Sequence, residues 1–131
     1  MRFLVRRELV QLLLVFVATK NLFISISLLI ARLVVLDTTS GRTVNTLPTV
    51  GDTDDVFYDA TRQLVFVIGG EGAVEILRQR DPDHYERASR VTTAPGARTG
   101  LFLQNSGRLY VAVPHRGPQP ARVFVYEVKV D

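Results

Sequence analysis

The chain has 131 residues, of which 47% are hydrophobic and 22% charged, as expected for one globular domain with a sizeable core. Its net charge is +3, and three arginines, Arg2, Arg6 and Arg7, lie near the start. Without these three the basic and acidic residues balance, so the rest of the chain is close to neutral. This charge distribution gives no specific nucleic-acid signal, which would need a clustered basic face. The chain contains no cysteine, which excludes disulfides, thiolate metal sites and a cysteine nucleophile.

Residues 1–30 form a hydrophobic N-terminal segment. It holds the apolar run Leu9–Ala18 and most of a second run, Leu22–Ala31, which ends just after it. A basic stretch followed by an apolar run is typical of a signal peptide or anchor, and it would bring residues 9–31 to a membrane. Neither run alone reaches the ~20 residues that span a bilayer, and their Val, Ile and Phe favour strand. The segment is therefore interpreted either as strand from a partial sheet or as a signal or anchor.

An internal repeat of about 45 residues organises residues 31–131. Gly51–Val67 matches Gly96–Ala112 at an offset of 45 without a gap. Each copy contains a glycine, a short apolar strand, a polar turn and a second apolar strand, and Phe57 falls on Phe102. Four short strands per unit at this period are typical of a β-propeller.

The repeat predicts an all-β fold, a partial β-propeller with two to three four-stranded antiparallel blades. All prolines fall between the predicted strands, as a sheet requires. In the first unit, Val15–Thr19 is expected as the second strand and Asn21–Ile30 as a long loop or a segment outside the repeat. The other predicted strands are Leu33–Asp37, Arg42–Leu47, Val56–Tyr58, Leu64–Ile68, Ala73–Leu77, Tyr85–Thr92, Leu101–Leu103, Arg108–Val113 and Arg122–Val128. The last unit is expected to lack its fourth strand.

The segment Leu33-Val-Val-Leu-Asp-Thr-Thr-Ser-Gly-Arg-Thr-Val44 resembles the V-x-V-I-D-x-x-x-G-x-x-V core of YVTN-repeat β-propellers, a group that includes YncE-like proteins. Gly51–Val67 and Arg108–Arg116 look like the C-terminal blades of bacterial members. The resemblance covers about residues 31–131 and implies a periplasmic or cell-surface protein. Because propellers close with 4–8 blades, it also implies self-association or missing blades of a longer propeller.

The alternation of strand direction predicts that the loops at residues 48–55, 69–72, 93–99 and 114–121 share one face of the molecule. We predict that this polar face binds a protein or small-molecule partner. The alternatives are solvated turns, in which Asp side chains cap backbone amides, and salt bridges between blades made by the arginines. The candidate residues are Asp52, Asp54, Asp55, Glu71, Arg98, His115 and Arg116.

Catalytic and metal motifs give little support for an enzyme. The chain has no G-x-S-x-G elbow, P-loop or H-E-x-x-H. The Asp cluster would suit a hard cation, but Gly51–Asp55 is also typical of a solvated turn, so no metal or cofactor is predicted. Asp81–His84 falls on the opposite face and is interpreted as a turn.

The favoured hypothesis is therefore a non-enzymatic propeller fragment that acts as a binding or scaffold module. One alternative is a fragment of a metal-dependent propeller hydrolase of the lactonase-like kind. The other is a membrane-anchored surface protein held by residues 9–31.

Overall fold

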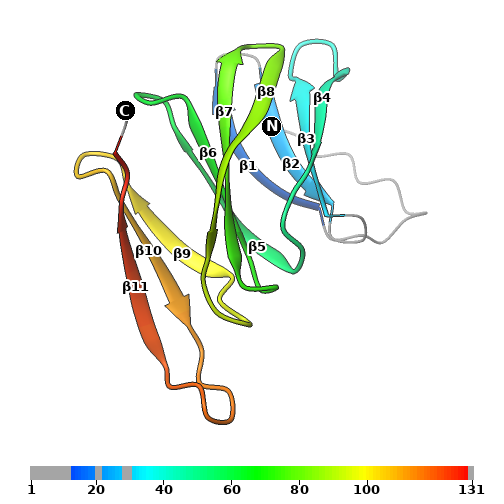
Figure 1. Ribbon diagram of the computed structural model, residues 1–131. Helices are drawn as coiled ribbons and strands as arrows, with labels where there is room; N and C mark the ends of the chain where they lie inside the picture. The colour runs from blue at the N-terminus through cyan, green and yellow to red at the C-terminus, as the bar shows by residue number, and fades with distance from the viewer. Residues whose placement is uncertain (1–12, 20–21, 28–30, 130–131) are drawn as a thin grey trace.

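A computed structural model of the chain describes residues 13–19, 22–27 and 31–129 and shows an all-β protein with three antiparallel sheets (Figure 1). Sheet A has the strand order β1-β2-β3-β4, sheet B β5-β6-β7-β8, and sheet C β9-β10-β11. The strands are β1 Leu13–Thr19, β2 Leu22–Ser27, β3 Arg32–Asp37, β4 Thr43–Pro48, β5 Thr53–Asp59, β6 Leu64–Gly69, β7 Ala73–Asp81, β8 His84–Thr92, β9 Thr99–Leu103, β10 Arg108–Val113 and β11 Arg122–Glu127.

The three sheets follow one another in chain order, with sheet B between the other two (Figure 1). The first strands of successive sheets contact each other, β1 with β5 and β5 with β9, and β4 contacts β8. One hydrophobic cluster lies between sheets A and B, and a second lies between sheets B and C. The described part of the chain therefore has two sheet-on-sheet cores.

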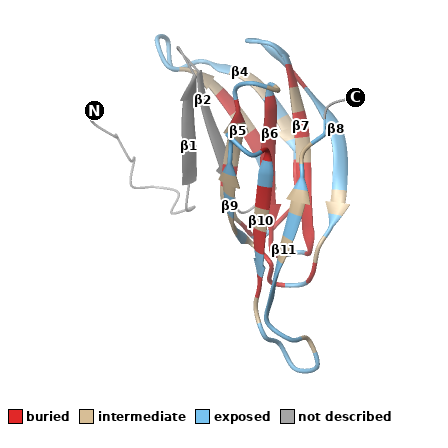
Figure 2. Ribbon diagram, turned by 90° about the vertical axis from the view of Figure 1, so that its left-hand side faces the viewer, coloured by how far each residue is buried: buried red, intermediate tan, exposed pale blue. Residues whose placement is uncertain are grey.

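Strand β6 is buried along its whole length because both faces of sheet B are covered (Figure 2). Val65 and Val67 join the cluster shared with sheet A, whereas Phe66 and Ile68 join the cluster shared with sheet C. The ring of Phe66 lies 5.0 Å from that of Phe102 in sheet C, centroid to centroid. A strand covered on both faces carries a continuous apolar run, as residues 64–68 do.

Sheet A corrects the prediction for the N-terminal segment. Leu22–Ser27 is strand β2, where a loop was expected, and it pairs with both β1 and β3. Residues 15–19 therefore belong to the first strand of the sheet, and the second position belongs to β2. The Ile-Ser alternation at residues 24–27 fits a strand. The alignment of the repeats did not match this segment to a strand in the other units, so the strand was not predicted.

The remaining residues of the first 30, namely 1–12, 20–21 and 28–30, lie outside the described part, and so do the predictions that fall on them. Within the described residues, no helix has the length and apolar character needed to cross a membrane.

The register of the sheets also corrects the repeat alignment. The hairpin turns Asp59–Leu64 and Leu103–Arg108 are 44 residues apart, one fewer than the alignment offset. Because side chains alternate between the two faces of a strand, a one-residue difference reverses the face. Phe57 of sheet B and Phe102 of sheet C accordingly pack into the same cluster from opposite sides. They are members of one cluster that come from two different sheets, and not equivalent residues.

Other strand ends differ modestly from prediction. β5 begins at Thr53, so Asp54 and Asp55 lie on a strand and not on a loop. The third sheet has three strands among the described residues, as predicted. Strand β7 buries the carboxylate of Glu75, which forms ion pairs with Arg87 and Arg90 from β8.

Candidate functional site

The loops predicted to share one face meet at one end of the molecule. Backbone hydrogen bonds join them in series: the Gly70 amide donates to the Asp52 carbonyl at 2.7 Å, and the Gly96 amide donates to the Gly70 carbonyl, also at 2.7 Å. The Thr93 amide donates to the Gly72 carbonyl at 2.8 Å. We call this end the loop face. It consists of residues 48–55, 69–72, 93–99 and 114–121.

Arg98 joins two sheets on the loop face. Its Nη1 lies 2.8 Å from Oδ1 of Asp52, and its Nε lies 2.7 Å from Oδ2 of Asp54. The hydrogen bond to Asp52, with the charges of both carboxylates, raises the pKa of Arg98 above its usual value. Arg98 precedes the first strand of sheet C, whereas both aspartates belong to the sheet B side. The predicted salt bridge between neighbouring units is therefore present at Arg98.

Two further carboxylates of the predicted site accept hydrogen bonds from backbone amides. Oδ2 of Asp55 accepts from the Gly100 amide of β9 at 2.7 Å, which is a second link between sheets B and C. Oε2 of Glu71 accepts from the Gly51 amide at 3.0 Å, which joins two loops of sheet B. Both side chains thus position the loop face.

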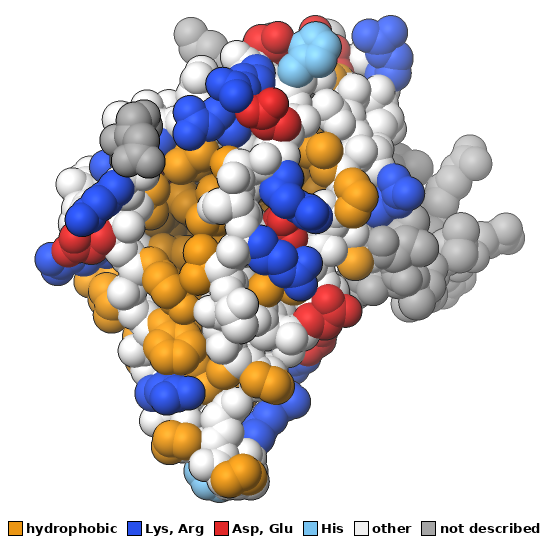
Figure 3. Space-filling model, viewed as in Figure 1, with side chains coloured by type: hydrophobic (Ala, Val, Ile, Leu, Met, Phe, Trp, Pro, Cys, Tyr) orange, Lys and Arg blue, Asp and Glu red, His pale blue; other side chains and the backbone are white. Residues whose placement is uncertain are grey.

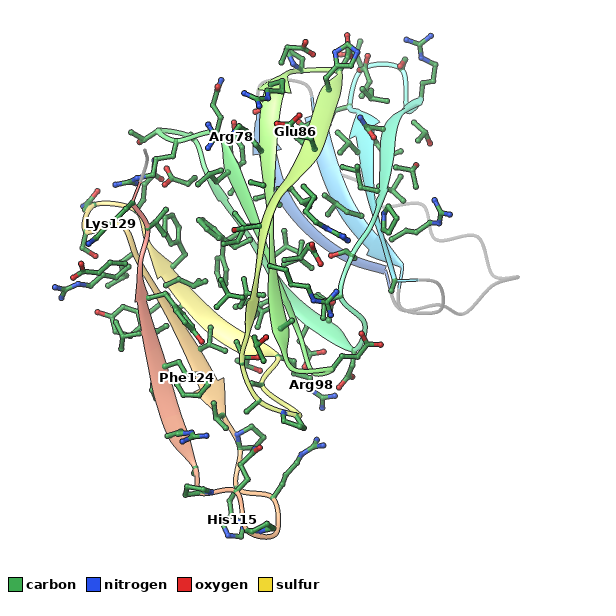
Figure 4. The ribbon with its side chains drawn as sticks, viewed as in Figure 1. Arg78, Glu86, Arg98, His115, Phe124 and Lys129 are labelled. Atoms are coloured by element: carbon green, nitrogen blue, oxygen red, sulfur yellow. The ribbon has the colours of Figure 1, made fainter. Side chains whose placement is uncertain are left out.

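His115 and Arg116 lie on the loop after β10, and both are exposed. The backbone of Arg116 exchanges two hydrogen bonds with Gln119, at 3.0 and 2.9 Å, which closes the loop. The Arg116 guanidinium covers Gly96, where an added Cβ would come within 2.6 Å of it. In Figure 4, Arg98 and His115 lie toward the same end of the molecule. These residues bring cationic and imidazole groups to the solvent side of the loop face.

Gln119 also anchors this loop, a role that was not predicted from the sequence. Its Nε2 donates to the Pro114 carbonyl at 2.8 Å and to the Pro95 carbonyl at 3.2 Å. The available sequence signal was its position between Pro118 and Pro120, since prolines restrict the chain and leave carbonyls in need of donors.

The turn at Asp81–His84 lies at the opposite end, where Figure 4 shows Glu86 and Arg78. Nδ1 of His84 lies 2.8 Å from Oδ1 of Asp81, and this contact is the largest cause of the lowered pKa of Asp81. The two predicted clusters are therefore separate. Among the residues that the structure describes, no three His, Cys, Asp or Glu side chains gather as a metal site would require.

An apolar groove of about 340 Å³ lies between sheets B and C. Figure 3 shows hydrophobic side chains gathered in the hollow between β8 and β11. Its lining includes Phe66 and Ile76 from sheet B and Tyr126 from sheet C, with Arg78 and Lys129 also contributing. Sequence periodicity could not reveal it, because it depends on how the two sheets are placed.

Comparison with known proteins adds no relative. No protein-family model matches the chain, and no curated protein does either. The resemblance of Leu33–Val44 to YVTN repeats therefore stays a prediction from those residues. The observed basis for a function is the geometry of the loop face, where hydrogen bonds and Arg98 join loops from neighbouring sheets.

Proposed function

We propose that the chain is three consecutive blades of a YVTN-like β-propeller and that it serves as a non-enzymatic binding or scaffold module. Three features support the blade arrangement. The sheets stack in chain order, β4 leads into the first strand of sheet B, and β8 leads into the first strand of sheet C. Each connection returns the chain from the last strand of one sheet to the first strand of the next, which is the connectivity of propeller blades.

The observation that carries the binding role is the construction of the loop face. Asp55 and Glu71 accept backbone amides, and Arg98 pairs with Asp52 and Asp54. These contacts hold loops from two sheets in one arrangement. A preorganised surface lowers the entropy that a partner must lose on binding, so it favours recognition.

The proposed partner is a protein or small molecule that contacts the exposed end of the loop face around His115 and Arg116. Exposed cationic and imidazole groups suit an acidic or hydrogen-bond-accepting partner surface. By the YVTN resemblance, the protein is proposed to act in the periplasm or at the cell surface.

The test compares proteins retained by the immobilised chain with those retained by two double variants. His115→Ala/Arg116→Ala alters the loop face, and the matched control His84→Ala/Arg80→Ala removes one histidine and one arginine from the opposite end. Partners bound by the unmodified chain should be lost with the first variant and kept with the second, in quantitative mass spectrometry.

Equal retention by all three proteins would overturn the loop-face role. Substrate turnover by the purified chain that the loop-face variant abolishes would overturn the non-enzymatic proposal.

A further inference from the structure

The outer face of sheet C, the face that points away from sheet B, is apolar and exposed. Leu101 and Leu103 of β9 are 52% and 42% exposed, and Val123 and Val125 of β11 are 60% and 53% exposed. These are the large hydrophobic side chains most exposed in the described part of the chain. Large exposed apolar patches commonly mark protein interfaces.

The other two sheets show what covers this face. Leu33-Val-Val-Leu36, Val74–Leu77 and Val123–Tyr126 are three copies of one strand, in β3, β7 and β11. Leu33 and Val35 are 0% exposed, because they face sheet B. Val74 and Ile76 occupy the same positions in sheet B and pack toward sheet C. Positions 123 and 125 therefore belong to a face that is covered by the next sheet in both other cases.

Sheet A carries the complementary surface at the other end of the chain. Val34 and Leu36 of β3 alternate with the buried Leu33 and Val35, so they point away from sheet B. Leu77 in sheet B and Tyr126 in sheet C hold the position of Leu36, and each packs against the preceding sheet. Each chain thus has one exposed face, on sheet C, of the kind that the next sheet covers. In β3 it has half-buried side chains at the positions that pack against a preceding sheet.

We propose that a second copy of this chain covers the outer face of sheet C with the outer face of its sheet A. The reciprocal contact then joins the remaining two faces, and two copies form a closed ring of six sheets. Six lies within the 4–8 blades that close a propeller. The ring rests on the proposed propeller arrangement, whereas the contact between the two faces rests on the repeat alone.

The first test is the mass of the full chain in solution by light scattering. The unmodified chain is expected at twice its 14.6 kDa mass. Val125→Glu places a carboxylate in the proposed interface and should raise the dimer dissociation constant on the order of 100-fold. Asn105→Glu adds the same charge to an exposed turn of sheet C and should leave the dimer intact. Monomers at every concentration, or dimers unaffected by Val125→Glu, would overturn the proposal.

A second test is independent of interface stability. The chain lacks cysteine, so single cysteines can be introduced without competing thiols. Position 125 is equivalent to Val35 and Ile76, which share their clusters with Leu77 and Tyr126. A mixture of Val125→Cys and Leu36→Cys chains should therefore form the mixed disulfide on oxidation. A mixture in which Asn105→Cys takes the place of either variant should not form a mixed disulfide.

The outcomes separate the contact from the ring. A dimer without the mixed disulfide would overturn the proposed pairing of faces. Open-ended assemblies that carry the disulfide would overturn the closed ring and the propeller arrangement with it. Neither result would affect the partner comparison at His115 and Arg116, so binding at the loop face is tested separately.

Discussion

At the scale of single residues, buried charge is placed where it can organise a turn. Asp59 at the end of β5 is fully buried, and its Oδ1 accepts from the Thr61 and Arg62 amides at 3.0 and 3.2 Å. Its Oδ2 pairs with the Arg62 guanidinium at 2.7 Å. Asp37 makes a related turn with the Thr39 amide, and this contact is the largest cause of its lowered pKa. The second turn, however, is exposed.

We therefore expect Asp59→Ala to lower the free energy of unfolding by about 2–3 kcal/mol, because it removes charge-assisted hydrogen bonds from a buried turn. Asp37→Ala removes hydrogen bonds of the same kind from an exposed turn and should lower the free energy of unfolding by clearly less. Urea unfolding of the two variants under one set of conditions measures the difference. Equal losses would contradict the importance of burial at Asp59.

At the scale of elements, a hydrogen-bonded side-chain network ties β5, β7 and β8 together. Nε2 of Gln79 donates to the Tyr85 hydroxyl at 2.7 Å, and the Tyr58 hydroxyl donates to Oε1 of Gln79. Burial raises the pKa of Tyr85 to about 12, with smaller contributions from neighbouring charges. It also raises the pKa of Tyr58. The neutral phenol is therefore the form that the folded sheet favours.

This network predicts a loss of stability at high pH. In the unfolded chain Tyr85 loses its proton near its ordinary pKa of 10, whereas in the folded chain it keeps the proton to about 12. Its contribution is thus fully present below pH 10 and is lost as pH rises toward 12. Urea midpoints measured across this range should fall more steeply for the unmodified chain than for Tyr85→Phe. Parallel slopes would contradict the prediction.

The strands themselves were largely predictable, and the exceptions are instructive. Local alternation and polar turns located most of the strands from β3 onward, because those signals lie within a few residues. Strand β2 was not predicted, because it lies in an apolar stretch that a signal sequence would also explain. The pairing of Phe57 with Phe102 was wrong by one residue, and only the hydrogen-bonded ladders of sheets B and C reveal this.

At the scale of the whole molecule, polar contacts between sheets B and C supplement the apolar clusters. Arg98 forms two ion pairs across the boundary, and all three side chains are between 43% and 47% exposed. Exposed ion pairs contribute little to stability, although two pairs on one arginine share its ordering entropy. Their main consequence is that they hold the loops of the two sheets in fixed positions relative to one another.

We expect Arg98→Ala to lower the free energy of unfolding by at most about 1 kcal/mol at low salt. At 1 M salt the screening length is about 3 Å, so most of that difference should disappear. Arg108→Ala is the matched control, because Arg108 pairs with Glu127 within sheet C at 3.4 Å. A loss at Arg98 that is independent of salt would show that packing, and not charge, is responsible.

The amino-acid sequence by itself determined the all-β class, most strand positions and the set of loops that share one face. These properties follow from local alternation, from turn residues and from the reversal of direction between successive strands. Only the tertiary structure decided that Asp52 and Asp54 pair with Arg98, that Phe57 and Phe102 join one cluster from two sheets, and that Val123 and Val125 are left exposed. These outcomes depend on register and on which sheet covers which face, and a one-residue shift, invisible in composition, reverses every side chain of a strand.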